Sequence, residues 1–181
     1  MEEINREKFM DDLLRKRIIY LDGDVTDDMA KRIGSSVLWL NAEDDTSEII
    51  LYINSSGGKV AAGLHLYDIV KHSKAPVTGI IYRIANSMAA IVLQACKKRK
   101  ALRHSEIILH NIQLTVSTEW HKIKEEVDRE VKETKKDQEA IYAILTERMG
   151  KTKAEIIKIL EESKKLSAEE AKEFGLIDEI I

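Results

Sequence analysis

The stretch at residues 76–95 changes from strand to helix character at a single serine, and this change constrains the fold more than any other feature of the chain. Residues 77–82 are mostly β-branched or aromatic, whereas residues 88–95 are mostly good helix formers. Ser87 therefore lies at a predicted strand-to-helix turn. Because the first N–H groups of a helix lack intrahelical partners, a hydroxyl there lies beside anion donors. Serine is also a favoured N-cap, and this stretch alone favours that simpler role.

Strand and helix patterns alternate along the chain, which predicts an α/β domain with a largely parallel sheet. Its 181 residues fit one domain, residues 1–181. A peripheral helix is expected at residues 5–15, and two capping boxes, at Thr152 and Ser167, open short helices near the C-terminus. The expected strands lie at residues 17–21, 47–53, 77–82 and 106–110, and the helices between them at residues 26–41, 60–71 and 88–95.

Composition excludes several classes of protein. The formal net charge of −3 offers no basic face for nucleic acid. The single cysteine, Cys96, excludes an internal disulfide framework, and the charged N-terminus is unlike a signal peptide. The most apolar stretch, residues 84–96, is shorter than the roughly 20 residues of a membrane span. We therefore expect a cytoplasmic protein with no membrane segment, metal or cofactor.

Residues 118–149 read as one long helix of about 45 Å, longer than the roughly 32 Å width expected for a globular domain of this size. This helix should project from the domain. A narrow apolar stripe of Trp120, Ile123, Val127 and Val131 runs among charged residues. Such a stripe favours a partner helix, and so self-association, over the alternative of a solvated surface helix.

Three predicted strand ends carry residues suited to acyl transfer. One strand ends at the Gly57-Gly58 turn, the next at Ser87 and a third at His110. In a parallel sheet, sites gather at such ends. Ser87 could act as nucleophile and His110 as general base, with the N–H of Met88 and one N–H of the glycine turn as oxyanion donors. Alternatively, the glycines form only a turn and His110 is a hydrogen-bonded interior histidine.

Six stretches resemble, in order, the proteolytic subunit of the Clp protease, and they cover nearly the whole chain. They are Arg17-Ile-Ile-Tyr-Leu, Leu51-Tyr-Ile-Asn-Ser-Ser-Gly-Gly, Ala62-Gly-Leu-His-Leu-Tyr-Asp, Asn86-Ser-Met-Ala-Ala, Ile108-Leu-His110, and Leu166-Ser-Ala-Glu-Glu-Ala-Lys-Glu-Phe-Gly-Leu-Ile-Asp.

This resemblance implies a repeated ββα superhelix, related to the crotonases, with the helix at residues 118–149 as a projecting handle. In the family, two heptameric rings stack through the handles and enclose the active sites. By position, the resemblance assigns Ser87 as nucleophile and His110 as base. It also implies unfolded polypeptides or peptides as substrates and an AAA+ unfoldase as partner.

The chain departs from the family pattern at functional positions. Ser163 stands where the family has the third triad residue, an aspartate, and neighbouring Glu162 would reach His110 only with a shifted backbone. In another serine protease, replacing that acid lowered kcat about 10⁴-fold. Asn111 begins a segment that replaces the family's Gln-Pro sequence after the histidine. Only 16 residues precede Arg17, so the family's axial pore loops are expected to be missing.

Three functions remain open at this stage. The leading hypothesis is a serine endopeptidase within a self-compartmentalised ring, weakened by loss of the triad acid. The second is a catalytically impaired ring subunit with a structural or regulatory role. The third, acyl-CoA chemistry of the crotonase type, ranks last because it usually uses carboxylates and a longer chain.

Overall fold

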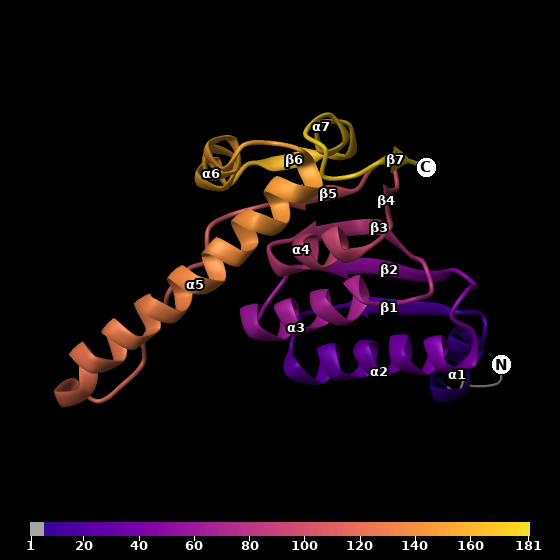
Figure 1. Ribbon diagram of the computed structural model, residues 1–181, viewed down its shortest axis with the longest axis horizontal. Helices are drawn as coiled ribbons and strands as arrows, with labels where there is room; N and C mark the ends of the chain where they lie inside the picture. The colour runs from indigo at the N-terminus through magenta and orange to yellow at the C-terminus, as the bar shows by residue number, and fades with distance from the viewer. Residues whose placement is uncertain (1–5) are drawn as a thin grey trace.

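The computed structural model describes residues 6–181, whose strands form a seven-stranded sheet (Figure 1). Its main path is parallel and runs in the order β1 (Ile18–Asp22), β2 (Ile49–Ser55), β3 (Val77–Asn86), β4 (Lys98–Ala101) and β7 (Glu179–Ile180). The short β5 (Glu106–Ile108) pairs in parallel with the end of β3, and β6 (Lys165–Ser167) runs antiparallel to β5. The predicted α/β fold with a largely parallel sheet is confirmed.

The helices follow the local signals in the sequence closely. The predicted helices at residues 60–71 and 88–95 are confirmed as α3 (Val60–Lys71) and α4 (Met88–Ala95). The Thr26 hydroxyl accepts a hydrogen bond of 3.1 Å from the Met29 N–H and so caps the helix α2 (Asp27–Glu43). Both predicted capping boxes are present. The remaining helices are α1 (Arg6–Arg15), α6 (Lys153–Glu162) and α7 (Ala168–Glu173).

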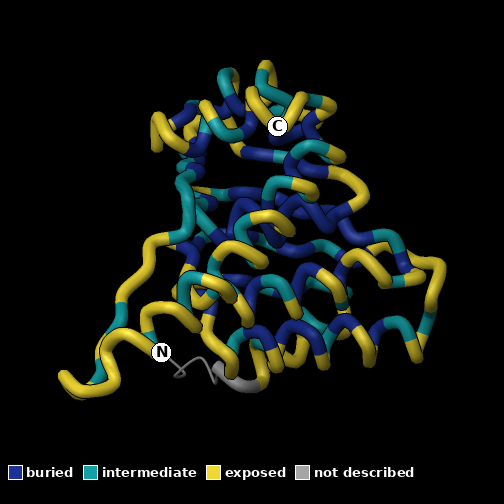
Figure 2. The backbone as a smooth tube through the Cα atoms, turned by 60° about the vertical axis from the view of Figure 1, so that its left-hand side comes forward, coloured by how far each residue is buried: buried dark blue, intermediate teal, exposed yellow. Residues whose placement is uncertain are grey.

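Helix α5 (Ile123–Met149) projects away from the sheet (Figure 1). It begins later than residue 118, because a single 3₁₀ turn, Trp120–Lys122, precedes it. Only its last turns contribute buried residues, and Gly150 ends it in the left-handed conformation at φ +64°. The far end is exposed (Figure 2): Trp120 keeps 86% of its surface accessible. In residues 6–181 no helix combines the length and apolar character that crossing a membrane requires.

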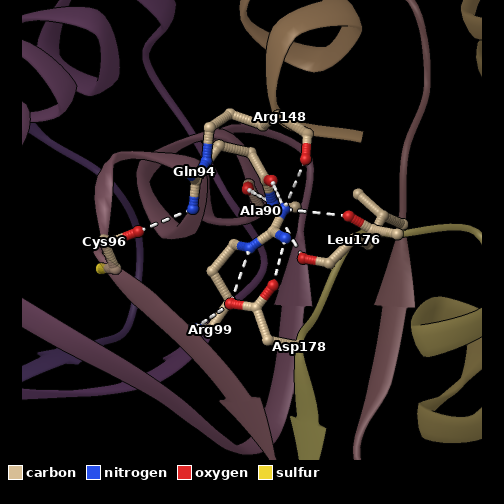
Figure 3. Close-up of polar contacts among 8 residues, drawn as sticks. Ala90, Gln94, Cys96, Arg99, Arg148, Leu176 and Asp178 are labelled. Carbon is tan, nitrogen blue, oxygen red and sulfur yellow. Dashed lines mark hydrogen bonds and ion pairs between the residues drawn. The ribbon is translucent and has the colours of Figure 1, made fainter. Parts of the chain in front are cut away.

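Strand β4, Lys-Arg-Lys-Ala in sequence, was not predicted, because its charged residues lack the composition of a strand. Arg99 is nevertheless buried, with 6% of its surface accessible. Its guanidinium donates to the Gln94 Oε1 at 2.7 Å and the Gly175 carbonyl at 2.9 Å, and it pairs with the Asp178 carboxylate (Figure 3). A buried cation needs such partners. Because Gly175 and Asp178 belong to the C-terminal segment and Arg99 to β4, these contacts attach that segment to the sheet.

The sheet register brings together the ends of β2, β3 and β5, the strands that lead to the glycine turn, Ser87 and His110. Ser55 at the end of β2 pairs with Ala85 in β3, and Ile108 at the end of β5 pairs with Asn86. The chain segments that leave these three strands therefore start side by side at one edge of the sheet.

Candidate active site

Ser87 occupies a strained backbone position between β3 and α4. Its φ of +52° and ψ of −125° lie in a region that favours glycine. The Ser87 N–H donates to the Ile108 carbonyl at 2.8 Å, and its carbonyl accepts from the Ala90 N–H at 3.0 Å. The side chain makes no capping hydrogen bond. The interpretation of this hydroxyl as a helix cap is therefore wrong. The backbone N–H and carbonyl of Ser87 are hydrogen-bonded, whereas its hydroxyl does not bond to the first turn of α4.

The predicted glycine turn lies directly against Ser87. Gly57 has a φ of +93°, and a Cβ there would come within 2.7 Å of the Ser87 Cβ and 3.0 Å of the Met88 nitrogen. The Gly57 N–H donates to the Ser55 Oγ at 3.1 Å and so is already engaged. Within residues 6–181, the N–H groups of Gly58 and Met88 have no hydrogen-bond acceptor. The N–H groups of Gly58 and Met88 are therefore candidate donors to an oxyanion.

Ser87 and His110 line one cavity of about 220 Å³ together with Gly58 and Met88. Its remaining walls are mostly apolar: Val60, Ile91, Leu109, Ile112, Gln113, Ile141 and Leu160. Across the described residues, no hydrogen bond joins the Ser87 hydroxyl to His110. The cavity thus brings a hydroxyl, an imidazole and two backbone donors to one small space, which is the set that acyl transfer requires.

His110 is oriented by its own chain. Its Nδ1 lies 2.7 Å from the carbonyl oxygen of Asn111. Ser163, which the resemblance is expected to place at the position of the family's acid, lies in the left-handed conformation at the end of α6, and its hydroxyl donates to the Leu160 carbonyl at 3.2 Å. Ser163 does not line the cavity. The Asn111 carbonyl was missed by sequence reasoning, since every residue carries such an oxygen and nothing in the sequence marks this one.

A larger cavity of about 1040 Å³ lies elsewhere, between α1 and the tyrosines of the first three strands. Tyr20 stacks on Tyr52 with ring centroids 5.3 Å apart, and Tyr82 meets both rings edge-on. Its lining contains no histidine that could serve as a base for a serine. In the described part of the chain, no cluster of histidine, cysteine and acidic side chains could hold a metal ion. Of these two cavities, the smaller one is therefore the candidate site for acyl transfer.

A comparison with protein families agrees with the fold. The family model described as Clp protease matches residues 2–181, almost the entire chain. The sequence motifs that suggested this family are thus part of a match over the full domain. The chain belongs to the Clp protease family, and its class of activity is that of a peptidase.

Proposed function

We propose that this chain is a serine endopeptidase that cleaves unfolded polypeptides or peptides through an acyl-enzyme at Ser87. One observation carries the proposal: Ser87, His110, Gly58 and Met88 line the same cavity. The strained conformation of Ser87 supports it further, because strain of this kind is retained where the surrounding structure requires it and is common at active sites.

The reaction follows from the roles that these groups can fill. The Ser87 oxygen attacks the scissile carbonyl carbon while His110 Nε2 takes the hydroxyl proton. The N–H groups of Gly58 and Met88 donate to the oxyanion that forms. His110 then gives the proton to the leaving amine, and a water molecule, activated in the same way, hydrolyses the ester. Closing of the gap between Ser87 and His110 accompanies substrate binding, since catalytic hydrogen bonds are often long in a free enzyme.

The proposed assembly is a pair of stacked heptameric rings joined through α5. The exposed stripe on α5 supports it: Trp120, Ile123 and Val127 keep 86%, 44% and 36% of their surface accessible. Apolar side chains at this spacing suit a second helix better than water. Within such a barrel the substrates would be unfolded chains, with an AAA+ unfoldase as the class of partner that delivers them.

A second function, a catalytically impaired ring subunit, has its own support. Ser163 replaces the acid, and its hydroxyl donates its hydrogen bond to the Leu160 carbonyl. Without a carboxylate, the imidazolium that forms during the reaction loses an electrostatic partner. The two functions therefore share the ring and differ in whether Ser87 reacts.

A fluorophosphonate probe, read by intact mass, separates these functions. The expected result is one adduct per chain in the wild-type protein and none in Ser87→Ala or His110→Ala. Ser36→Ala is the matched control, because Ser36 lines the larger cavity and donates to the Arg32 carbonyl at 2.9 Å. Adduct formation and peptide turnover that persist in Ser87→Ala would contradict the nucleophile assignment, and an unlabelled wild-type ring would favour the impaired subunit.

A further inference from the structure

The contact between His110 and Asn111 indicates which nitrogen of the imidazole carries a proton. A carbonyl oxygen only accepts hydrogen bonds, so the His110 Nδ1 that lies 2.7 Å from it must carry the proton. In a neutral imidazole the other nitrogen, Nε2, then has a free lone pair. This is the tautomer that a general base needs in order to take a proton from a serine, and here no carboxylate is required to select it.

We propose that the Asn111 carbonyl replaces the missing carboxylate as the acceptor for His110, and that Tyr142 and Gln138 of α5 are positioning residues that hold this carbonyl in place. The Tyr142 hydroxyl donates to the Asn111 Oδ1 at 3.1 Å. The Gln138 Oε1 accepts from the Ile112 N–H at 2.8 Å. Tyr142 and Gln138 are four residues apart on α5 and so face the same way. This inference rests on the proposed function and names the orienting groups of the same site.

The chain before His110 is fixed as well. The Asn86 Oδ1 accepts from the Ile108 N–H at 2.9 Å, and the Ile108 carbonyl accepts from the Ser87 N–H at 2.8 Å. The histidine is therefore held between two anchors. One ties β5 to the turn that carries the nucleophile, and the other ties the next residues to α5.

A carbonyl is a weaker partner than a carboxylate. Hydrogen bonds to a charged acceptor are roughly twice as strong as neutral ones, and a neutral oxygen adds no negative charge beside the imidazolium. The Asn111 carbonyl therefore selects the tautomer but stabilises the transition state less. We expect an active enzyme that is slower than relatives with the acid, and one whose activity depends on residues of α5 that do not line the cavity.

The test compares Tyr142→Phe with the wild-type protein. The substitution removes one hydroxyl and frees the Asn111 side chain, so the maximal rate of fluorophosphonate labelling should fall about three- to tenfold, the effect of one ordinary hydrogen bond. The concentration of probe that gives half the maximal rate should stay unchanged, because Tyr142 does not line the cavity. The matched control is Tyr67→Phe, which removes the same hydroxyl from a buried tyrosine of α3 and should label at the wild-type rate.

Asn111→Ala provides a second route to the same contact. It removes the acceptor of the Tyr142 hydroxyl and should slow labelling to a similar degree. The double variant should be no slower than either single one, since both remove one interaction. Additive losses, or a Tyr142→Phe protein that labels at the wild-type rate, would overturn the positioning role.

The imidazole tautomer gives a readout that does not require activity. Nitrogen-15 NMR of histidine-labelled rings, with His110→Ala to assign the signals, should show His110 protonated at Nδ1 and unprotonated at Nε2. In Tyr142→Phe the two tautomers should mix. If His110 is protonated at Nδ1 in the wild-type protein and the tautomers mix in Tyr142→Phe, but the wild-type protein does not react with the probe, the proposed function fails and the orienting contact stands. If Nε2 carries the proton in the wild-type protein, the inference is wrong whether or not Ser87 reacts.

Discussion

The close approach of Gly57 to the Ser87 turn predicts that one added methyl group should disable the site. In Gly57→Ala the new Cβ would lie 2.7 Å from the Ser87 Cβ and from the Asn86 carbonyl oxygen, whereas ordinary contacts begin at 3.4 Å. One side must therefore move by up to 0.7 Å, the difference between these two distances. Its neighbours are backbone atoms and a Cβ, so no flexible side chain can absorb the shift. The Met88 N–H, 3.0 Å away, would move with the turn.

Two costs are expected from this variant, and a second glycine separates them. The positive φ of +93° costs about 1–3 kcal/mol of stability for alanine. Gly23 has a similar φ of +101°, but a Cβ there would meet nothing within 4 Å. Gly23→Ala should therefore lose stability without disturbing the site. Gly57→Ala should lose at least as much stability, because its Cβ also overlaps its neighbours, and should show a fall in labelling of about 10²-fold, typical of a misplaced oxyanion donor.

The assay combines thermal unfolding with labelling kinetics at a temperature where both variants are folded. Each kcal/mol should lower Tm by about 2–4 °C for a chain of this length. The decisive quantity is the ratio of labelling rates between the two alanine variants. A ratio near one, with both proteins folded, would refute the argument that the Ser87 turn can keep its reactive position only if residue 57 has no Cβ.

Three other perturbations test the remaining features. Asp178→Asn should cost about 1–3 kcal/mol at pH 7, less than a fully buried pair because the carboxylate is 43% exposed. Burial opposes ionisation of Asp178, but the hydrogen bonds from Arg99 outweigh it and hold the pKa of the carboxyl below its usual value. The difference in Tm between the wild-type protein and Asp178→Asn should therefore be largest above about pH 4 and should shrink as the pH falls through the lowered pKa. Val127→Glu should split the assembly into smaller species by mass photometry, while Lys132→Glu on another face of α5 should not; equal masses would contradict the stripe as a contact. Burial raises the pKa of Cys96 to about 12, so iodoacetamide at pH 8 should alkylate the urea-unfolded chain and leave the folded one unmodified.

Local signals in the sequence were sufficient for most of the fold. Helices α3 and α4 have the predicted bounds because the Gly57-Gly58 turn lies just before α3 and the change from strand-type to helix-type residues at Ser87 marks the start of α4. Strand β4 could not be predicted, since Arg99 is buried only by virtue of acceptors such as Gly175 and Asp178, far along the chain. The start of α5 was placed too early, because the residue pattern does not distinguish the single 3₁₀ turn at Trp120–Lys122 from a first turn of α-helix.

The candidate site divides in the same way. The shared cavity of Ser87 and His110 was a reasonable expectation, because parallel strands bring their ends to one edge. The groups that orient His110 were out of reach, because the acceptor is a backbone oxygen of Asn111 and its support comes from Tyr142 on a distant helix. Sequence motifs mark side chains, whereas this site uses main-chain atoms for the orienting contact.

The backbone of Ser87 has an implication for how such a chain changes over generations. At φ +52° and ψ −125°, glycine would be more comfortable than any residue with a side chain. Selection for stability alone would therefore favour glycine at this position, which would remove the hydroxyl and raise the free energy of unfolding. A serine in so unfavourable a place is therefore consistent with a role for its hydroxyl outside folding.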